Sequence, residues 1–275
     1  MELQNAHALV TGGSRGIGPL IARALLMRGA RVTLTARSED DLGRVRERLG
    51  AERVAAVPGD VALEKDRQRL LKEAEAGFGP LDLLVNNAGI ELVLPFPSME
   101  REEIHRVIAV NLEAPIQLTR LAVPGMIERG RGHVVNMSSL AGKFPPPFHT
   151  IYAATKSGLV GFTLSLRSEL RGTGVSASVI CPGFVYGAGV FVRDRTSQRL
   201  PKRSGAYTTA KQVAVEVVRA VESDVPDIIV AKPLAKLADV VLAISPRLAD
   251  LAGRMSGAYV PQIEEARIRA ERRDG

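Results

Sequence analysis

Tyr152 and Lys156 are two side chains whose types and spacing could move a proton to or from a bound molecule. A separation of four residues on a helix places a phenol and an ammonium group on the same face. A phenol with a pKa of about 10 is a poor acid or base at neutral pH, and a nearby cation favours the phenolate and lowers that pKa. The pair therefore predicts a tyrosine that protonates a carbonyl oxygen or deprotonates an alcohol.

A glycine-rich loop near the start of the chain could hold an anion. It reads Thr-Gly-Gly-Ser-Arg-Gly-Ile-Gly over residues 11–18, between a β-branched run and a helical pattern. Glycines allow the backbone to approach a pyrophosphate, and the start of a helix presents free N–H groups and the positive end of its dipole. Because the motif sits between a strand and a helix, it predicts a dinucleotide site, with a ligand-free glycine turn as the alternative.

The residues after the second expected strand indicate which dinucleotide is bound. An acidic residue there would accept hydrogen bonds from the ribose 2′-hydroxyl of NAD, but Ala36 offers no carboxylate. Arg37 can form a fork of hydrogen bonds to a 2′-phosphate, and Arg15 can approach it from the glycine loop. These two arginines predict NADP(H), and the alternative is that both are ordinary exposed charges.

The glycine spacing, together with Asn-Asn-Ala-Gly at residues 86–89, resembles the short-chain dehydrogenase/reductase family over residues 6–231. This resemblance implies that Asp60 and Val61 flank the adenine and that a Pro-Gly turn lies beside the nicotinamide. Gly187 stands where the family usually has a threonine that bonds the carboxamide, so backbone groups of Val185 or of the following loop are expected to replace it. The expected cofactor contacts are Gly12, Ser14, Arg15, Gly16, Ile17, Gly18, Arg37, Asp60, Val61, Asn87, Ala88, Gly89, Tyr152, Lys156, Pro182, Gly183 and Val185.

The same resemblance implies a catalytic set of four residues. Ser139 lies thirteen residues before Tyr152, which matches the family's spacing, and its hydroxyl would polarise the substrate oxygen. Lys156 would tune Tyr152 and contact the nicotinamide ribose, and Asn111 would hold a water in a proton relay. The neighbouring Ser138 is expected to be a hydrogen-bonding residue at the end of a strand. Each feature alone has a structural explanation, whereas their combination and order favour catalysis.

The elements that must position these residues alternate along the chain. Short β-branched runs predict seven strands, at 6–11, 31–36, 53–57, 81–85, 133–137, 175–180 and 227–231. Amphipathic patterns predict helices at 17–28, 39–49, 64–76, 100–127, 151–170 and 210–222. Strict alternation predicts an α/β fold with a Rossmann-type, doubly wound parallel sheet of about seven strands, helices on both faces and a C-terminal helical extension.

Several local features refine this prediction. Ser38 is expected to cap the helix at 39–49, with Asp41 at the capping-box position. Pro115 and Pro124 are expected to bend or interrupt the long helix at 100–127. We expect residues 1–231 to form the dinucleotide-binding and catalytic domain and residues 232–275 to extend it, ending in a solvated helix or a frayed end.

Two segments could shape the substrate site. Residues 184–207 are glycine-rich at their start and are the candidate substrate lid. Residues 233–259 have helix-like apolar spacing, which fits a flap over the site, a subunit interface, a membrane-surface element or packing on the protein's own domain. These aliphatic residues, with the apolar stretch at 144–148, favour a hydrophobic substrate.

Composition limits the other classes of function. The chain has 275 residues, 45% hydrophobic and 24% charged, and no apolar stretch approaches the length of about 20 residues that spans a bilayer. Its net charge of +7 is spread beside acidic residues, so we expect solvated faces and no nucleic acid, although peripheral membrane contact is open. A single cysteine and the absence of a signal-peptide pattern indicate the cytoplasm, and the four histidines lack metal-ligand spacing.

Together these features predict an oxidoreductase that transfers hydride between NADP(H) and a carbonyl or secondary alcohol. The alternatives are a non-catalytic NADP(H)-binding regulator or scaffold, and a 3-oxoacyl thioester reductase within the same family. A nucleophilic role for Ser139 is disfavoured because no nucleophile-elbow glycine pattern surrounds it. The resemblance also implies a homo-oligomer.

Overall fold

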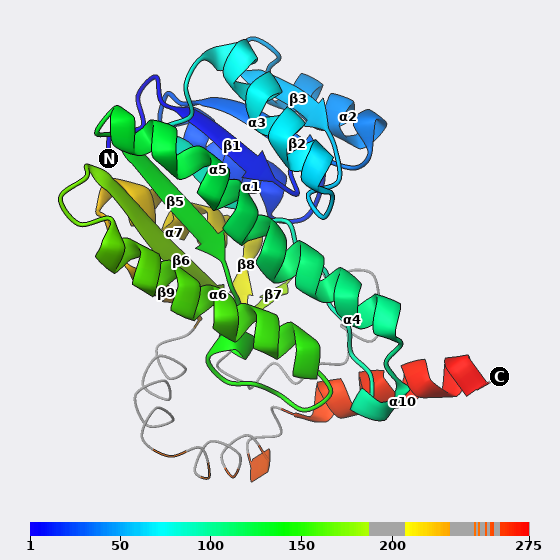
Figure 1. The fold of residues 1–275 in the computed structure, drawn as a ribbon. Coiled ribbons are helices and arrows are strands. Elements are labelled where there is room, and N and C mark those ends of the chain that lie inside the picture. The colour runs from blue at the N-terminus through cyan, green and yellow to red at the C-terminus, as the bar shows by residue number, and fades with distance from the viewer. Residues whose placement is uncertain are drawn as a thin grey trace.

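A seven-stranded parallel sheet forms the centre of the computed structural model (Figure 1). The structure describes residues 1–186 and 207–231, positions 245, 247, 251, 254 and 255, and residues 259–274. The strand order is β3-β2-β1-β4-β5-β6-β9, and every neighbouring pair runs parallel. The strands are β1 (His7–Thr11), β2 (Arg31–Ala36), β3 (Val54–Pro58), β4 (Leu83–Asn86), β5 (Gly132–Met137), β6 (Val175–Pro182) and β9 (Asp227–Val230).

Helices cover both faces of the sheet, as the alternation of patterns predicts. The helices of one face are α1 (Gly18–Leu26), α2 (Glu39–Leu49) and α7 (Ala210–Glu222). Those of the other are α3 (Glu64–Phe78), α5 (Ala114–Glu128) and α6 (Thr150–Glu169), and α4 (Arg101–Ile108) continues the line of α5 beyond the ends of the strands (Figure 1). The doubly wound fold and the expected strands are therefore confirmed, with small differences at their ends.

Successive residues of a strand pack alternately into the two hydrophobic cores. In β1, Ala8 and Val10 pack with α1, α2 and α7, whereas Leu9 between them packs on the opposite side with α3 and α5. All three are fully buried. Because both faces of the sheet are covered, β1 is a nearly continuous apolar run rather than an alternating one. Both cores stiffen the strand whose end carries the glycine loop.

The long helix expected at 100–127 is interrupted, but at only one of the two prolines. Residues Ala109–Glu113 form a π-helical turn in which the Ala114 amide donates to the Ala109 carbonyl, five residues back. Pro115 follows directly and has no N–H to continue the α-helical pattern, which explains the position of the break. Pro124 does not interrupt the helix, since it lies inside the continuous helix α5. The Ser38 cap is confirmed, with its hydroxyl accepting from the Asp41 amide at 3.2 Å.

The two segments expected near the substrate lie mostly outside the described residues. The ends of the candidate lid are described: β7 (Phe184–Tyr186) pairs in parallel with β8 (Tyr207–Thr209). Gly187 and most of 233–259 fall outside the described ranges. The final helix, α10 (Val260–Asp274), is present, but the expectation that it is fully solvated is wrong because Gln262, Glu265 and Ala266 are buried. Among the described residues, no helix has the length and apolar character to cross a bilayer.

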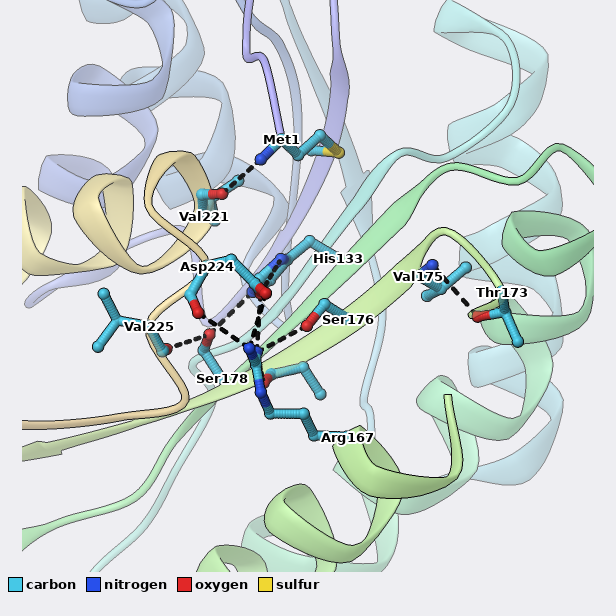
Figure 2. A network of polar contacts seen from close by, with 11 residues as sticks. Met1, His133, Arg167, Thr173, Val175, Ser176, Ser178, Val221, Asp224 and Val225 are labelled. Atoms are coloured by element: carbon cyan, nitrogen blue, oxygen red, sulfur yellow. Dashed lines mark hydrogen bonds and ion pairs between the residues drawn. The ribbon is translucent and has the colours of Figure 1, made fainter. Parts of the chain in front are cut away.

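A polar network lies at the amino ends of β5 and β6, at the opposite end of the strands from the glycine loop (Figure 2). Arg167 of α6 forms hydrogen bonds of 2.7 Å to both carboxylate oxygens of Asp224, which follows α7. Beneath this pair, the buried His133 Nε2 lies 2.9 Å from the Ser178 hydroxyl. Since that hydroxyl donates to the Val225 carbonyl at 2.6 Å, it accepts from Nε2–H of a neutral imidazole. The network links α6 and α7 across strands β5 and β6.

Because His133 is buried, we expect the protein to lose stability in acid. Burial lowers the pKa of its imidazole from the ordinary 6.5 to about 4, against an opposing attraction from Asp224. Between those values the unfolded chain binds the proton more readily, so the stability present above pH 6.5 is lost as the pH falls toward 4. The loss should amount to about 3 kcal/mol in the free energy of unfolding.

Urea unfolding of the wild type and of His133→Gln at several pH values measures this loss. The glutamine amide can keep the bond to Ser178 but does not titrate, so its stability should depend less on pH by that amount. Parallel curves for the two proteins from pH 7.5 to pH 4 would show that His133 does not carry the acid sensitivity.

Candidate active site

The strand order creates a crevice at the carboxyl ends of β1 and β4. Successive strands proceed outward from β1 through β2 to β3, and the chain then returns to place β4 on the other side of β1. In open parallel sheets, ligands bind where the strand order reverses in this way. The glycine loop follows β1 and the Asn-Asn-Ala-Gly segment follows β4, so two predicted cofactor segments meet at this point.

The glycine loop leaves little space for a side chain at Gly12, Gly13 or Gly18. Gly12 and Gly16 have positive φ angles of 66°. A Cβ atom on Gly18 would lie 2.2 Å from the Gly12 carbonyl oxygen, because helix α1 starts directly against the loop. Ser14 is half-buried, and Ile17 occupies the N-cap position of α1. This compact turn brings backbone N–H groups and a helix N-terminus together, which is the arrangement that suits a pyrophosphate.

Thr11 joins the loop to the segment after β4. Its hydroxyl accepts hydrogen bonds of 2.9 Å from the amides of both Asn87 and Ala88. The Asn87 side chain in turn donates to the Thr11 carbonyl at 2.8 Å and to the Gly12 carbonyl at 3.3 Å. Thr11 is thus held beside Asn87 and Ala88, which lie 76 and 77 positions further along the chain. The three predicted contacts Asn87, Ala88 and Gly89 are held at the crevice.

Basic residues gather at the end of β2. Arg37 and Arg15 are both exposed, from the end of β2 and from the glycine loop. Asp60 lies near Arg37 and accepts a 2.6 Å ion-paired hydrogen bond from Arg106. Burial opposes ionisation of Asp60, but the bonds from Arg106 and the Ala62 amide and the charge of Arg37 lower its pKa overall. The Val61 side chain is turned into the core.

Asn111 is fully buried within the π-helical turn. Its amide oxygen accepts from the Ile90 amide at 2.9 Å, and its amide nitrogen donates to the Ile90 carbonyl at 2.8 Å. The same nitrogen lies 3.4 Å from the Thr155 hydroxyl of α6. A Cβ atom on Gly89 would meet the Asn111 oxygen at 3.5 Å and the Lys156 ammonium at 3.6 Å. The structure therefore brings Asn111, Lys156 and Gly89 together, as the resemblance implies.

Ser139 and Tyr152 meet at the end of β5. The hydroxyl of Ser139 is hydrogen-bonded to the Tyr152 phenol and also accepts from the Ala141 amide at 3.1 Å. Ser138 points the other way and donates to the Lys156 carbonyl at 2.8 Å, which confirms its expected role. A Cβ atom on Gly142 would lie 2.8 Å from that carbonyl, so the turn after Ser139 packs directly on helix α6.

The charge state of Tyr152 differs from the expectation based on spacing. Burial and the negative charge of Glu91 raise the pKa of the phenol, while the Ser139 hydrogen bond lowers it in part. Lys156 Nζ lies 5.7 Å from the centre of the Tyr152 ring and donates to the Met137 carbonyl at 2.8 Å. Burial lowers the pKa of Lys156 to about 8. The expectation that Lys156 lowers the phenol's pKa is therefore wrong for this structure, which holds Tyr152 protonated at neutral pH.

The Pro-Gly pair at the end of β6 turns the chain toward β7. Pro182 is buried and remains in register with Val230 of β9, and the Gly183 amide donates to the Val230 carbonyl at 3.1 Å. Val185 follows in β7 and is partly buried. These residues stand at the same edge of the sheet as Ser139, as expected for a loop beside the reacting centre.

Glu91 and His149 belong to the site although no sequence motif indicates them. His149 Nε2 lies 2.8 Å from Glu91 Oε1, and both side chains are buried beside Tyr152. Within the described part of the chain, no group of three His, Cys, Asp or Glu side chains could hold a metal ion. Their positions could have indicated them: Glu91 follows the segment after β4, and His149 lies three residues before Tyr152.

A cavity of about 820 Å³ lies on another side of helix α6. Its walls include Pro145, Phe148 and Ala154, with Tyr259 and Ile263 from the C-terminal region. None of the four predicted catalytic residues lines it. The apolar stretch at 144–148 thus forms an apolar surface together with the C-terminal segment.

The fold and this site define an α/β protein of the dinucleotide-binding class. The family model of short chain dehydrogenase matches residues 6–199, and the chain belongs to this family. Ketoacyl reductase HetN from Nostoc sp. is 39% identical over 99% of this chain and 96% of its own length. A short chain dehydrogenase from Pseudocercospora fijiensis is 40% identical over 67% of this chain and 61% of its own length.

Two solved structures have folds similar to this chain. A metagenomic short-chain oxidoreductase in complex with NADP has a TM-score of 0.71 and 34% identity, covering 84% of this chain and 98% of its own. An actinorhodin polyketide ketoreductase with NADPH has a TM-score of 0.74 and 30% identity, covering 84% of this chain and 97% of its own. The family resemblance, the oxidoreductase class and the Rossmann-type fold are therefore confirmed.

Proposed function

We propose that this protein is an NADP(H)-dependent oxidoreductase that reduces the carbonyl group of a hydrophobic substrate to an alcohol. The observation that carries the proposal is the half-buried Tyr152 phenol, which has Ser139 as a hydrogen-bond partner and lies on the helix that also carries the buried Lys156. A phenol held protonated at the carboxyl edge of the sheet is suited to donate a proton. The reverse reaction uses the same groups.

The four predicted catalytic residues have different roles. Tyr152 donates its proton to the carbonyl oxygen, and the Ser139 hydroxyl polarises and orients that oxygen. The bound nicotinamide supplies the hydride. Lys156 contributes a positive charge beside the phenol and a donor for the nicotinamide ribose. Asn111 holds the Ile90 backbone and approaches Lys156 from the π-helical turn. It would position the water of a proton relay toward the lysine.

The preference for NADP(H) rests on Arg37 and Arg15. Both are exposed at the edge where an adenosine ribose would lie, and Ala36 precedes Arg37 where an NAD site would have an acid. A guanidinium can form paired hydrogen bonds to a 2′-phosphate. The NADP and NADPH complexes of the two structural relatives support this choice.

Replacing Arg37 with Ala should raise the KM for NADPH by roughly 10- to 100-fold, which is the effect of losing one or two charge-assisted hydrogen bonds. The KM for NADH should change little, because NADH has no 2′-phosphate. Steady-state kinetics with both cofactors measures the difference. Arg48→Ala, which removes an exposed arginine in the last turn of α2, is the matched control. A wild type that prefers NADH would disprove this assignment.

A 3-oxoacyl thioester is the second candidate substrate. The ketoacyl reductase from Nostoc sp. matches almost the whole chain, and a polyketide ketoreductase shares its fold. An NADPH-consumption screen over ketones, aldehydes and acyl thioesters compares the candidates directly. Turnover of thioesters alone would favour this narrower function, and no turnover on the whole panel would favour a non-catalytic scaffold. A homo-oligomer, a cytoplasmic location and the division at residue 231 stay predictions.

A further inference from the structure

A buried ion pair lies beside the predicted proton donor. Glu91 Oε1 and His149 Nε2 are 2.8 Å apart, and their side chains are only 6% and 3% exposed. Removing two charged groups from water costs several kcal/mol each, so such a pair gives little net stability compared with apolar residues of the same size. Its position therefore calls for another explanation.

The pair ties two functional segments together. Glu91 follows Ile90, whose backbone is held on both sides by Asn111. His149 stands at the N-cap position of α6, and its carbonyl accepts from the Ala153 amide at 2.7 Å. Its ring meets the Tyr152 ring edge to face, with centres 5.9 Å apart. One hydrogen bond thus fixes the start of the tyrosine's helix to the segment that follows β4.

The charges of this pair act on the phenol. Tyr152 faces Glu91, Lys156 and Cys181, and after burial the Glu91 carboxylate is the largest influence raising its pKa. His149 faces Glu91 and, from α10, Glu265. Burial opposes protonation of His149, but the hydrogen bond and charge of Glu91, the Pro147 carbonyl and the charge of Glu265 outweigh it and raise its pKa above the ordinary value. His149 therefore takes up a proton more readily than an ordinary imidazole, beside the carboxylate nearest to the phenol.

We propose that Glu91 and His149 are positioning residues which hold Tyr152 against Ser139 and set the pH range in which the phenol exchanges its proton. The inference rests on the proposed function, in which Tyr152 is the proton donor. The Glu91 carboxylate disfavours the phenolate, and its hydrogen bond to His149 fixes where that charge lies. Removal of the Glu91 charge should therefore shift the proton exchange, whereas a replacement of His149 that keeps the hydrogen bond should not.

The first test is the pH profile of alcohol oxidation in Glu91→Gln and His149→Gln. Oxidation needs the phenolate, so its rate rises with pH as Tyr152 loses its proton. Glu91→Gln removes the negative charge and should move this rise to lower pH by about half a unit or more. His149→Gln keeps a hydrogen-bond donor to the carboxylate and removes no negative charge, so it should leave this rise in place. The double variant, which can keep an uncharged amide pair, should shift as Glu91→Gln does.

Controls separate this effect from a general loss of structure. Asp224→Asn removes a carboxylate from an ion pair at the opposite edge of the sheet and should leave the pH profile in place. A fall in kcat without a shift in the profile of Glu91→Gln, or an equal shift in His149→Gln, would show that the pair is merely structural and would overturn the inference.

The second test needs no turnover. With only four histidines in the chain, NMR titration can follow His149 directly. It should titrate above pH 6.5 in the wild type and below it in Glu91→Gln, where burial dominates. An unchanged titration in that variant would overturn the inference even if the wild type turned over every substrate. A wild type without turnover would refute the proposed function alone, and the titration would still decide whether the charged pair exists.

Discussion

Replacing Tyr152 with Phe is expected to lower kcat for carbonyl reduction by about 1,000-fold while leaving the Kd for NADPH within about twofold. The substitution removes one oxygen atom and with it the proton that the substrate oxygen receives, and proton transfer by a positioned group contributes about 100- to 10,000-fold to catalysis. The ring would keep its edge-to-face contact with His149. The volume of the site would stay almost unchanged, so folding should be unaffected.

Stopped-flow measurement of a single turnover would isolate the chemical step from product release, and NADPH fluorescence titration would give the Kd. An unchanged melting temperature is the control for folding. A variant that retained a tenth of the wild-type kcat would show that another group donates the proton. A wild type that binds NADPH as tightly as the variant, with equally low turnover, would instead support the scaffold.

The second large effect is expected from Gly18→Ala, which should raise the Kd for NADPH by about 100-fold or more. A methyl group at this position would lie 2.2 Å from the Gly12 carbonyl oxygen, so either the loop or the start of α1 must move. That movement would disorganise the N–H groups predicted to hold the pyrophosphate. A 100-fold loss corresponds to about 2.7 kcal/mol of binding free energy.

Gly43→Ala is the matched control, since it makes the same change inside helix α2, where a Cβ atom would meet nothing within 4 Å. It should leave the Kd unchanged and stabilise the fold by about 0.5–1 kcal/mol, because alanine favours the helix. Isothermal titration and urea unfolding would provide both numbers for each variant. A normal Kd in Gly18→Ala would show that the glycine loop does not hold the cofactor.

Much of the fold could be predicted because it depends on local patterns. Runs of β-branched residues alternate with amphipathic stretches, and this alternation is enough to indicate a parallel sheet with helices on both faces. The π-helical turn at Ala109–Glu113 could not be placed in the same way. A proline indicates a lost donor, but whether the helix breaks there or accommodates it, as at Pro124, depends on tertiary packing.

The candidate site was predictable where its members lie in sequence motifs and unpredictable where they meet only in space. Tyr152, Lys156 and the glycines belong to short segments with fixed spacing. Glu91 and His149 are 58 positions apart, and neither is unusual in its own segment. The same limit explains the wrong expectation for the phenol's pKa, because spacing indicates the nearby lysine but not the depth of burial or the carboxylate.

The π-helical turn also makes the orientation of Asn111 depend on the number of residues in its helix as well as on their types. Losing one residue from Ala109–Glu113 would let this stretch close as an ordinary α-helical turn and would remove the wider turn that carries Asn111. The hydrogen bonds that join Asn111 to Ile90 and Thr155 depend on the extra residue of the turn. In evolution, this stretch should tolerate substitutions far better than insertions or deletions.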